Sequence, residues 1–317
     1  MENLDIARVA KLNNGMMDAV LKEMNGILEG DRILTDVPMK DHTSMRVGGN
    51  AKIVVLPSSV DEIREIIRYL GRNSIPFYVI GNGTNLIVRD SGYNGVIIKL
   101  SDNFSSVTVN ENIITAKSGA SIVSVSNTAC EKSLSGLEFA AGIPGTVGGA
   151  VVMNAGAYDG EMKDVVFEVT CLDHAGDMVS LRNDDLEFGY RTSRMQNDSL
   201  VVLEVSMRLN EGNRDSIRDK MKELNRRRRE KQPLNHPSAG SIFKRPEGYF
   251  AGKLIEEAGL RGFRIGGAQV SEKHCGFIIN TGTATASDVI ELIEYIKKKV
   301  FETSGVMLQQ EVKILGG

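Results

Sequence analysis

The chain has 317 residues, of which 41% are hydrophobic and 25% are charged, and its formal net charge at pH 7 is −3. This composition is typical of a globular protein with a large core and room for two or three domains. It excludes a global basic field that would attract nucleic acid, and no apolar run is long enough to span a bilayer.

The first part of the chain alternates predicted helices and strands. Residues 1–30 have the pattern of an amphipathic helix and not of a signal peptide, so we expect a cytoplasmic location. Residues 31–57 look extended, and the segment 58–62 caps a helix that we expect to stop at Gly71. The pattern then predicts strands within 77–100 and 107–117 and a helix at 121–132.

The second part continues with strands and then changes character. Glu211 to Asn213 break the pattern, and 214–231 is predicted to be a strongly charged helix that ends before Pro233. We place a domain boundary there. The remaining predicted elements are strands at 165–172, 178–181 and 200–209, helices at 249–258 and 286–303, and strand-like runs at 269–279 and 307–315.

Cysteine and histidine spacing gives no sign of a metal site. Cys130, Cys171 and Cys275 have neither metal-ligand spacing nor the even number that a disulfide framework needs. The four histidines are equally dispersed. We therefore expect buried or incidental thiols and no bound metal.

Two glycine-rich segments are the most informative part of the sequence. Residues 135–158 read SGLEFAAGIPGTVGGAVVMNAGAY, and residues 77–90 read FYVIGNGTNLIVRD. Because glycine lacks a Cβ and adopts positive φ, main-chain amides in such segments can approach an anionic ligand such as a diphosphate. Two segments of this kind predict one large phosphate-bearing ligand. The alternative is that the glycines only form tight turns.

The upstream segment does not fit a dinucleotide-binding Rossmann unit. Gly81 and Gly83 give G-x-G, and Asp102 follows at about the expected distance. A Rossmann loop must open a helix, whereas Leu86 here begins a β-rich run. No P-loop is present either, so the predicted ligand site is of another kind.

The basic run at 226–229 could suggest nucleic-acid binding, but its sequence context argues against that function. Its four arginines share a predicted helix with Glu223 and Glu230 and lack interleaved aromatic residues. A solvated helix face is the favoured interpretation. Lys231, beside the Pro233 stop, is better placed to meet a small anionic molecule.

Three separated segments each place one polar residue among small or apolar neighbours. Arg191 lies in FGYRTS, Ser241 in PSAGSIFK and Glu311 in LQQEVK. Arg191 could clamp a carboxylate, and Ser241 could donate or relay a proton. Glu311 could act as an acid or hold an adjacent carboxylate in its protonated form. A salt bridge, a capping hydroxyl and an edge-strand charge are the respective alternatives.

These motifs together resemble the UDP-N-acetylenolpyruvoylglucosamine reductase family. The resemblance covers roughly residues 42–316, in the right order, through HTSMRVGGNA, GNGTNLIVRD, the 135–158 segment, FGYRTS, GSIFKRP, AGKLIEEAGLRG and EVKILG. It implies an α+β protein: a two-subdomain FAD-binding fold of the vanillyl-alcohol-oxidase type, followed by a smaller α+β substrate domain. The implied boundaries are 1–30 for a helical segment, 31–100 and 101–212 for the FAD-binding subdomains, 213–306 for the substrate domain and 307–317 for a strand that returns toward the flavin.

The family reaction implies non-covalent FAD as cofactor and NADPH as co-substrate. NADPH would reduce the flavin and leave, and UDP-N-acetylglucosamine enolpyruvate would then take the hydride at C3, giving UDP-N-acetylmuramate for peptidoglycan synthesis. By resemblance, the FAD contacts would be Arg46, Gly81, Asn82, Gly83, Thr84, Asn85, Ile143, Gly145, Thr146, Gly149 and Asn154.

The same resemblance assigns roles to the three polar candidates. Arg191 and Glu311 would hold the substrate carboxylate and polarise the double bond, and Ser241 would protonate C2, because hydride addition to C3 builds an enolate-like charge that needs stabilisation. The implied substrate contacts are Tyr190, Lys231, Lys244 and Arg245. About fifty residues separate Arg191 from Ser241, which leaves no room for the tyrosine loop of one branch, so the chain resembles the shorter subgroup.

Two other functions are considered. One is a different FAD-dependent oxidase of the same fold, in which a covalent flavin would survive acid precipitation. The other is a nucleotide-sugar-binding protein without catalysis, which would tolerate Ser241→Ala and Glu311→Gln. For the reductase we expect a monomer that needs no nucleic acid, membrane or metal.

Overall fold

The computed structural model describes residues 14–317 and divides the chain into two compact units, each assembled from separate segments. The first unit comprises Met1–Val37, Ala51–Gly81 and Asn94–Leu224, and the second comprises Pro38–Asn50, Asn82–Tyr93 and Asn225–Gly317. The part of the predicted N-terminal helix at 1–13 lies outside the described residues, and helix α1 covers Asn14–Ile27.

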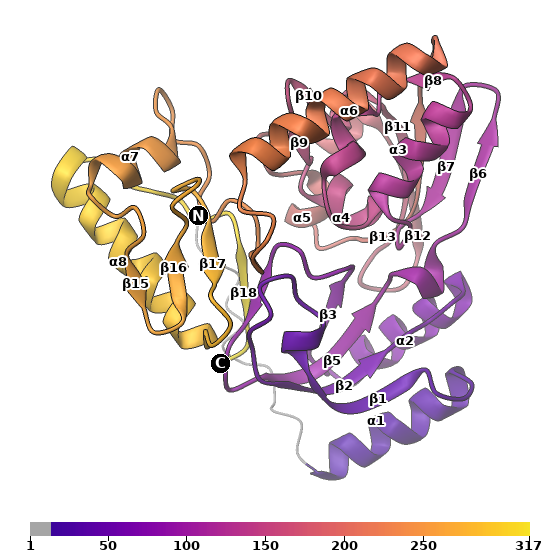
Figure 1. The fold of residues 1–317 in the computed structure, drawn as a ribbon. Helices are drawn as coiled ribbons and strands as arrows, with labels where there is room; N and C mark the ends of the chain where they lie inside the picture. The colour runs from indigo at the N-terminus through magenta and orange to yellow at the C-terminus, as the bar shows by residue number, and fades with distance from the viewer. Residues whose placement is uncertain (1–13) are drawn as a thin grey trace. The chain divides into compact units, whose positions relative to one another are not determined.

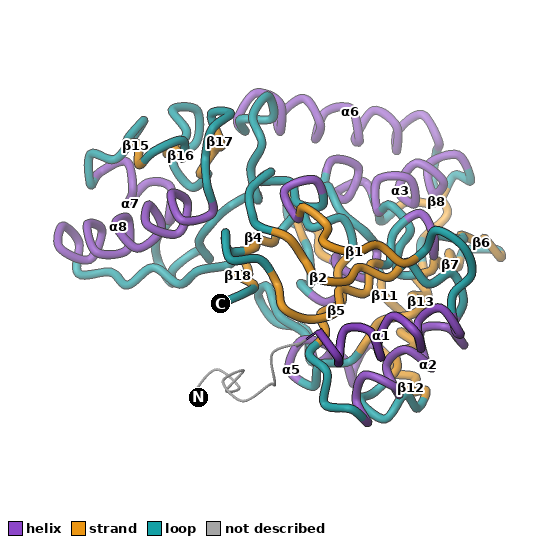
Figure 2. The backbone as a smooth tube through the Cα atoms, turned by 90° about the horizontal axis from the view of Figure 1, so that it is seen from below, coloured by secondary structure: helices purple, strands orange, loops and turns teal. Residues whose placement is uncertain are grey.

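The first unit begins with a four-stranded sheet covered by two helices. Its strand order is β1 (Ile33–Pro38), β2 (Asn50–Val55), β5 (Tyr93–Lys99) and β3 (Phe77–Ile80). Helices α1 and α2 (Val60–Arg72) lie side by side (Figures 1 and 2). The apolar face of α2, including Ile63 and Ile67, is fully buried against this sheet's core.

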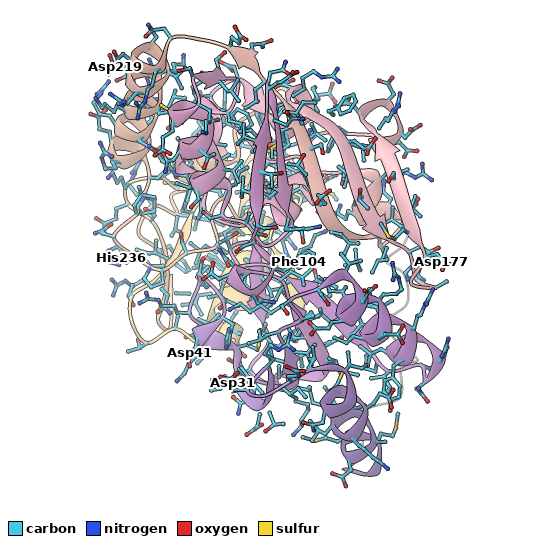
Figure 3. The ribbon with its side chains drawn as sticks, turned by 90° about the vertical axis from the view of Figure 1, so that its right-hand side faces the viewer. Asp31, Asp41, Phe104, Asp177, Asp219 and His236 are labelled. Carbon is cyan, nitrogen blue, oxygen red and sulfur yellow. The ribbon has the colours of Figure 1, made fainter. Side chains whose placement is uncertain are left out.

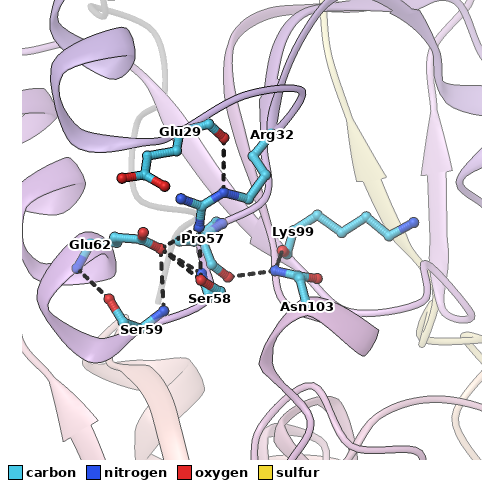
Figure 4. Close-up of polar contacts among 8 residues, drawn as sticks. All are labelled: Glu29, Arg32, Pro57, Ser58, Ser59, Glu62, Lys99 and Asn103. Carbon is cyan, nitrogen blue, oxygen red and sulfur yellow. Dashed lines mark hydrogen bonds and ion pairs between the residues drawn. The ribbon is translucent and has the colours of Figure 1, made fainter.

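The capping box predicted for α2 is confirmed (Figure 4). The Ser59 hydroxyl accepts a hydrogen bond from the Glu62 amide at 3.2 Å, and the Glu62 carboxylate accepts one from the Ser59 amide at 3.3 Å. Arg32 also pairs with Glu62 at 2.8 Å. The helix runs one residue beyond the predicted stop at Gly71, because Arg72 still belongs to its last turn and Asn73 caps it.

A second, five-stranded antiparallel sheet completes the first unit (Figure 1). Two helices, α3 (Ile122–Glu131) and α4 (Val147–Val152), pack on its core. Asp177 marks the turn between β11 and β12 (Figure 3). The strand order is β12 (Met178–Arg182), β11 (Val166–Leu172), β13 (Val201–Arg208), β7 (Ile113–Lys117) and β6 (Val107–Asn110).

The charged helix predicted at 214–231 is confirmed as α6 (Arg214–Lys231), which carries Asp219 (Figure 3). Arg226 on this helix pairs with Glu230 at 2.6 Å. The short elements are η2 (Asp102–Phe104), β8 (Leu134–Ser135), η3 (Glu138–Gly142), β9 (Gly156–Ala157), β10 (Gly160–Glu161), η4 (Met162–Asp164), η5 (Asn183–Leu186), α5 (Arg194–Asn197) and β14 (Asn210–Glu211).

The second unit combines the C-terminal part of the chain with two short segments from its N-terminal third. Met45, Val47 and Ile87 from those segments are buried in the same core as the helices and strands that follow residue 250. Its elements are η1 (Met39–Asp41), β4 (Leu86–Val88), α7 (Ala251–Glu257), β15 (Arg264–Ile265), β16 (Ala268–Val270), β17 (Ile278–Asn280), α8 (Ala286–Ser304) and β18 (Lys313–Leu315).

Two connections fix the segment Asn82–Tyr93 in the second unit. Strands β4 and β18 pair in parallel, with Leu86 opposite Lys313. Asp90 accepts hydrogen bonds from the amides of Ala286 and Ser287 at 2.9 and 2.8 Å, at the N-terminus of α8. These contacts join parts of the sequence that are about 200 residues apart.

Candidate functional site

The upstream glycine segment forms a tight loop in the second unit. Gly83 has a φ of +61°, and a Cβ there would collide with the His42 carbonyl, so both conformation and space require glycine. The backbone amides of Asn82, Gly83 and Thr84 donate no hydrogen bond to any residue of 14–317. The loop leads into strand β4, which confirms that no Rossmann helix opens here.

Gly81, the last residue before that loop, belongs to the first unit. A Cβ on Gly81 would collide with the Thr146 side chain, so the end of β3 passes directly against the start of α4. Thr146 is the N-cap of α4, and its hydroxyl accepts a hydrogen bond from the Gly149 amide at 3.4 Å. The sequence did not predict this short helix, because glycine has low helix propensity. The helix forms with Thr146 as its N-cap, which stabilises its first turn.

Within this segment, Gly148 and Gly149 have different reasons to be glycine. A Cβ on Gly148 would lie 2.7 Å from the Ser118 Cβ, and the Gly148 amide donates to the Ser118 carbonyl at 2.8 Å. Close packing therefore accounts for Gly148, and its amide is not available to a ligand. A Cβ on the exposed Gly149 would meet only the Thr146 hydroxyl, at an ordinary 3.5 Å. No contact inside the unit requires glycine at that position.

The residues of both segments fit a phosphate-bearing cofactor. The amides of Gly145 and Thr146 have no acceptor among the described residues, and Gly145 has a φ of +129°. Ile143, just before them, packs partly buried against the core. Unpaired amides in strained, glycine-dependent loops are the donors that bind phosphate oxygens.

Ser118 is a further polar residue here that we did not select from the sequence. Its side chain is 3% exposed, and its hydroxyl has no hydrogen-bond partner within residues 14–317. It lies against Gly148 at the start of α4. The glycine that follows it, in KSGAS, was the only available sequence signal.

Arg191 lies at the tip of a tight hairpin in the first unit. Gly189 and Thr192 exchange backbone hydrogen bonds of 3.1 and 3.3 Å across that hairpin. Arg191 adopts a left-handed φ of +56°, and its guanidinium donates to the Gly156 carbonyl at 3.0 Å. The same group lies 5.3 Å from the ring centroid of the exposed Tyr190. Strained backbone of this kind is typical of functional sites.

Asn154 supports that hairpin from a fully buried position. Its side-chain nitrogen donates to the Gly189 carbonyl and to Glu161, both at 3.0 Å, and its oxygen accepts from the Lys163 amide at 3.0 Å. Asn154 therefore holds the loop that carries Arg191. Its contact with the cofactor stays a prediction.

Ser241 and Glu311 lie on neighbouring backbone segments of the second unit. The Glu311 amide donates to the Ile242 carbonyl at 2.8 Å, and the Lys244 amide donates to the Gln309 carbonyl at 2.8 Å. Ile242 is fully buried, whereas Ser241 is exposed and Glu311 is half-buried. The ladder therefore brings the backbone segments that carry Ser241 and Glu311 side by side.

Asn85 connects this ladder to the upstream glycine loop. Its side-chain nitrogen donates to the Glu311 carbonyl at 3.3 Å, and its carbonyl accepts from the Lys313 amide at 3.0 Å. The loop with unpaired amides and the backbone of Glu311 are therefore joined by hydrogen bonds.

Two basic side chains of the second unit each lie near a lysine. Partial burial and the neighbouring Lys244 ammonium lower the pKa of Lys313, a residue that we did not select from the sequence. Burial, together with Lys231, also lowers the pKa of His274. The Arg245 guanidinium lies 4.0 Å from the ring centroid of Phe250. The neighbouring ammonium groups of Lys244 and Lys313 favour an anionic ligand.

The two units divide the predicted site residues between them. Neither a group of three metal-ligating side chains nor a helix able to cross a membrane occurs in the described part of the chain. The first unit carries Gly81, Ile143, Gly145, Thr146, Gly149, Asn154, Tyr190 and Arg191, and the second carries Arg46, Asn82, Gly83, Thr84, Asn85, Lys231, Ser241, Lys244, Arg245 and Glu311.

Comparisons with known proteins identify two family domains. A family model described as "FAD binding domain" matches residues 51–182, and one described as "UDP-N-acetylenolpyruvoylglucosamine reductase, C-terminal domain" matches residues 232–315. The predicted α+β class, an FAD-binding domain followed by a smaller domain, is thereby confirmed.

Relatives of similar length match nearly the whole chain. The UDP-N-acetylenolpyruvoylglucosamine reductase of Caldanaerobacter subterraneus subsp. tengcongensis is 51% identical, over 95% of this chain and 99% of the relative. That of Clostridioides difficile is 52% identical, over 92% and 95%. The crystal structure of the reductase from Thermus caldophilus is 35% identical, with a TM-score of 0.76, and the match covers 90% of this chain and 98% of that one.

Proposed function

The chain belongs to the UDP-N-acetylenolpyruvoylglucosamine reductase family, and from that premise we propose that it reduces UDP-N-acetylglucosamine enolpyruvate to UDP-N-acetylmuramate in peptidoglycan synthesis. It is an FAD-dependent oxidoreductase with NADPH as co-substrate. This identity over nearly the full length favours the reductase over an oxidase of the same fold. A cytoplasmic location, a monomeric state and independence of metal belong to the same proposal.

Bound FAD would carry a hydride from NADPH to C3 of the enolpyruvyl group. The residues that would hold FAD are those with unpaired amides, Asn82 to Thr84 in one loop and Gly145 with Thr146 in the other. Gly149 would leave room for the cofactor, since the fold itself does not require glycine there. The remaining members of the predicted FAD set, including Arg46 and Asn154, stay part of this proposal.

The polar residues would act on the substrate. As the hydride reaches C3, negative charge develops at C2 and on the attached carboxylate, where the Arg191 guanidinium and a protonated Glu311 carboxyl would stabilise it. Ser241 would then donate its proton to C2. A serine hydroxyl is a weak acid, so this step depends on a prepositioned hydroxyl and a strongly basic enolate-like carbon.

The observation that carries this assignment is the backbone ladder between the segments of Ser241 and Glu311. The Glu311 amide bonds to the carbonyl of Ile242, the residue next to Ser241, at 2.8 Å. This register supports a shared role at one reacting carbon for two residues 70 positions apart in the sequence. Tyr190, Lys231, Lys244 and Arg245 would bind the anionic UDP-sugar.

The domain organisation of the proposal follows the family pattern. Residues 31–100 and 101–212 would form the FAD-binding subdomains, 213–306 the substrate domain and 307–317 the returning strand. The parallel pairing of β18 with β4 supports the last assignment, because β4 directly follows the glycine loop.

Anaerobic half-reactions test this function. The flavin of purified protein is reduced with NADPH, excess NADPH is removed, and UDP-N-acetylglucosamine enolpyruvate is added while visible flavin absorbance is followed. Return of the absorbance is expected. A flavin that stays bleached until oxygen enters would instead indicate an oxidase of another substrate.

Ser241→Ala separates the two half-reactions. We expect flavin reduction by NADPH to change less than about twofold, and reoxidation by the substrate to slow by roughly 10²–10⁴-fold, the usual contribution of a general acid. Ser238→Ala, in the same loop, is the matched control. Equal slowing of both half-reactions would contradict a role of Ser241 in proton donation.

A further inference from the structure

Arg46 has an unusual conformation for a non-glycine residue. Its φ is +54°, in the left-handed region, and it lies between the buried residues Met45 and Val47, which are 0% and 2% exposed. The Arg46 side chain is exposed, and its guanidinium has no hydrogen-bond or ion-pair partner in the described part of the chain. A left-handed backbone conformation costs free energy in a non-glycine residue, so surrounding contacts must offset that cost for it to persist.

Asn280, at the end of β17, provides such contacts. Its side chain is 5% exposed, and its amide nitrogen donates to the carbonyls of Met45 at 3.1 Å and of Arg46 at 3.3 Å. Its amide oxygen accepts from the backbone amides of Gly282 at 2.8 Å and Ala284 at 3.1 Å. Because carbonyls only accept and backbone amides only donate, these four bonds fix the orientation of the Asn280 side chain.

Thr43 holds the same turn from the other side. Its carbonyl accepts from the Arg46 amide at 3.2 Å, and its hydroxyl donates to the Val47 carbonyl at 3.3 Å. Met45 and Val47 are anchored in the core of the second unit. Residue 46 therefore has its backbone fixed on both sides, while its cationic side chain stays exposed.

We propose that Asn280 is a positioning residue for Arg46: it holds the backbone of residue 46 in the left-handed conformation and thereby presents the guanidinium to FAD. This inference rests on the proposed function, in which Arg46 is a cofactor contact. A turn with ordinary φ would direct the Arg46 side chain elsewhere, since Cβ leaves the backbone in a different direction. Asn280 would act on the cofactor only through Arg46.

A double-mutant cycle on FAD affinity tests this dependence. Apoprotein is titrated with FAD, and quenching of flavin fluorescence gives the dissociation constant of the wild type, Arg46→Ala, Asn280→Asp and the double variant. Asn280→Asp keeps the oxygen that accepts from Gly282 and Ala284 but removes the two donors to the 45–46 carbonyls. Asn235→Asp introduces the same charge at an exposed position of the same unit and is the matched control.

If Asn280 acts through Arg46, the two effects are not independent. We expect each single variant to weaken FAD binding roughly tenfold, the usual effect of losing one hydrogen bond to a charged group, and the double variant to do little more. Fold-changes that multiply to about a hundredfold would overturn the proposal. Wild-type affinity in Asn280→Asp would overturn it as well.

Folding is checked separately by thermal unfolding of each apoprotein. If Asn280→Asp does not fold, Asn280→Ala takes its place, because it removes the bonds to the Met45 and Arg46 carbonyls without adding a charge. Multiplying fold-changes in that cycle would overturn the proposal in the same way. The titration uses neither NADPH nor the UDP-sugar, so failure of the reductase reaction leaves its result interpretable.

Discussion

Gly149→Ala is expected to separate the stability of the chain from its cofactor affinity. Gly149 is the third residue of helix α4, and it is exposed. The added methyl would meet only the Thr146 hydroxyl, at 3.5 Å, which is an ordinary van der Waals contact. The apoprotein therefore gains a better helix former without a steric penalty.

The expected magnitudes follow from this geometry. Alanine in place of glycine within a helix stabilises by about 0.5–1 kcal/mol, which raises the unfolding midpoint by about 1–3 °C. If FAD lies against Gly149, the methyl occupies space that the cofactor needs. We expect FAD affinity to fall by roughly ten- to a hundredfold, which corresponds to about 1.4–2.8 kcal/mol.

Thermal unfolding of the apoprotein and fluorescence titration with FAD measure the two effects. Gly148→Ala is the matched control, because a Cβ on Gly148 would lie 2.7 Å from the Ser118 Cβ. That variant should lose about 1–3 kcal/mol of stability through overpacking. A Gly149→Ala protein that binds FAD with wild-type affinity would refute the assignment of Gly149 as a cofactor contact.

Two further predictions concern ionisable groups. Partial burial raises the pKa of Asp90, but hydrogen bonds from Ser287 and from the Ala286 amide outweigh it and hold the pKa below its usual value. The resulting stabilisation is present above about pH 4, the ordinary pKa of an aspartate, and is lost as the pH falls through the lowered pKa. The thermal unfolding midpoints of wild type and Asp90→Asn should therefore converge as the pH falls from 7 to 3. A constant difference between the two midpoints would argue against this linkage. Burial raises the pKa of Cys171 to about 12. Its thiol should therefore resist a thiol reagent at pH 8 until the chain unfolds. Peptide mass mapping that finds Cys171 modified in the native protein would disprove this.

The sequence predicts those elements whose signals are local. The capping box of Ser59 and Glu62 predicts the start of α2, and the charged run bounded by Gly212 and Pro233 predicts α6 to the residue. These signals succeed because caps, periodicity and chain-breaking residues act within a few positions.

The parts that the sequence does not predict depend on contacts between distant segments. The short helix α4 has a glycine-rich sequence. It forms where the Gly148 amide donates a hydrogen bond to the Ser118 carbonyl and where the capping Thr146 side chain packs against Gly81. The left-handed backbone of Arg46 is held by Asn280, 234 positions away, and an asparagine at the end of a strand carries no local signature. The candidate site shows the same division: the glycine loops are visible as motifs, whereas the backbone bond between Ile242 and Glu311 is not.

The pairing of β4 with β18 sets an order of events for folding. Leu86 pairs with Lys313, so the edge of β4 gains its partner only after residue 313 has been synthesised. Contacts of such long sequence separation form slowly, because loop closure costs entropy before any pairing is gained. During synthesis on the ribosome, the apolar run at 86–88 therefore lacks its partner strand, and needs protection from aggregation, long after the sheets of the first unit can form.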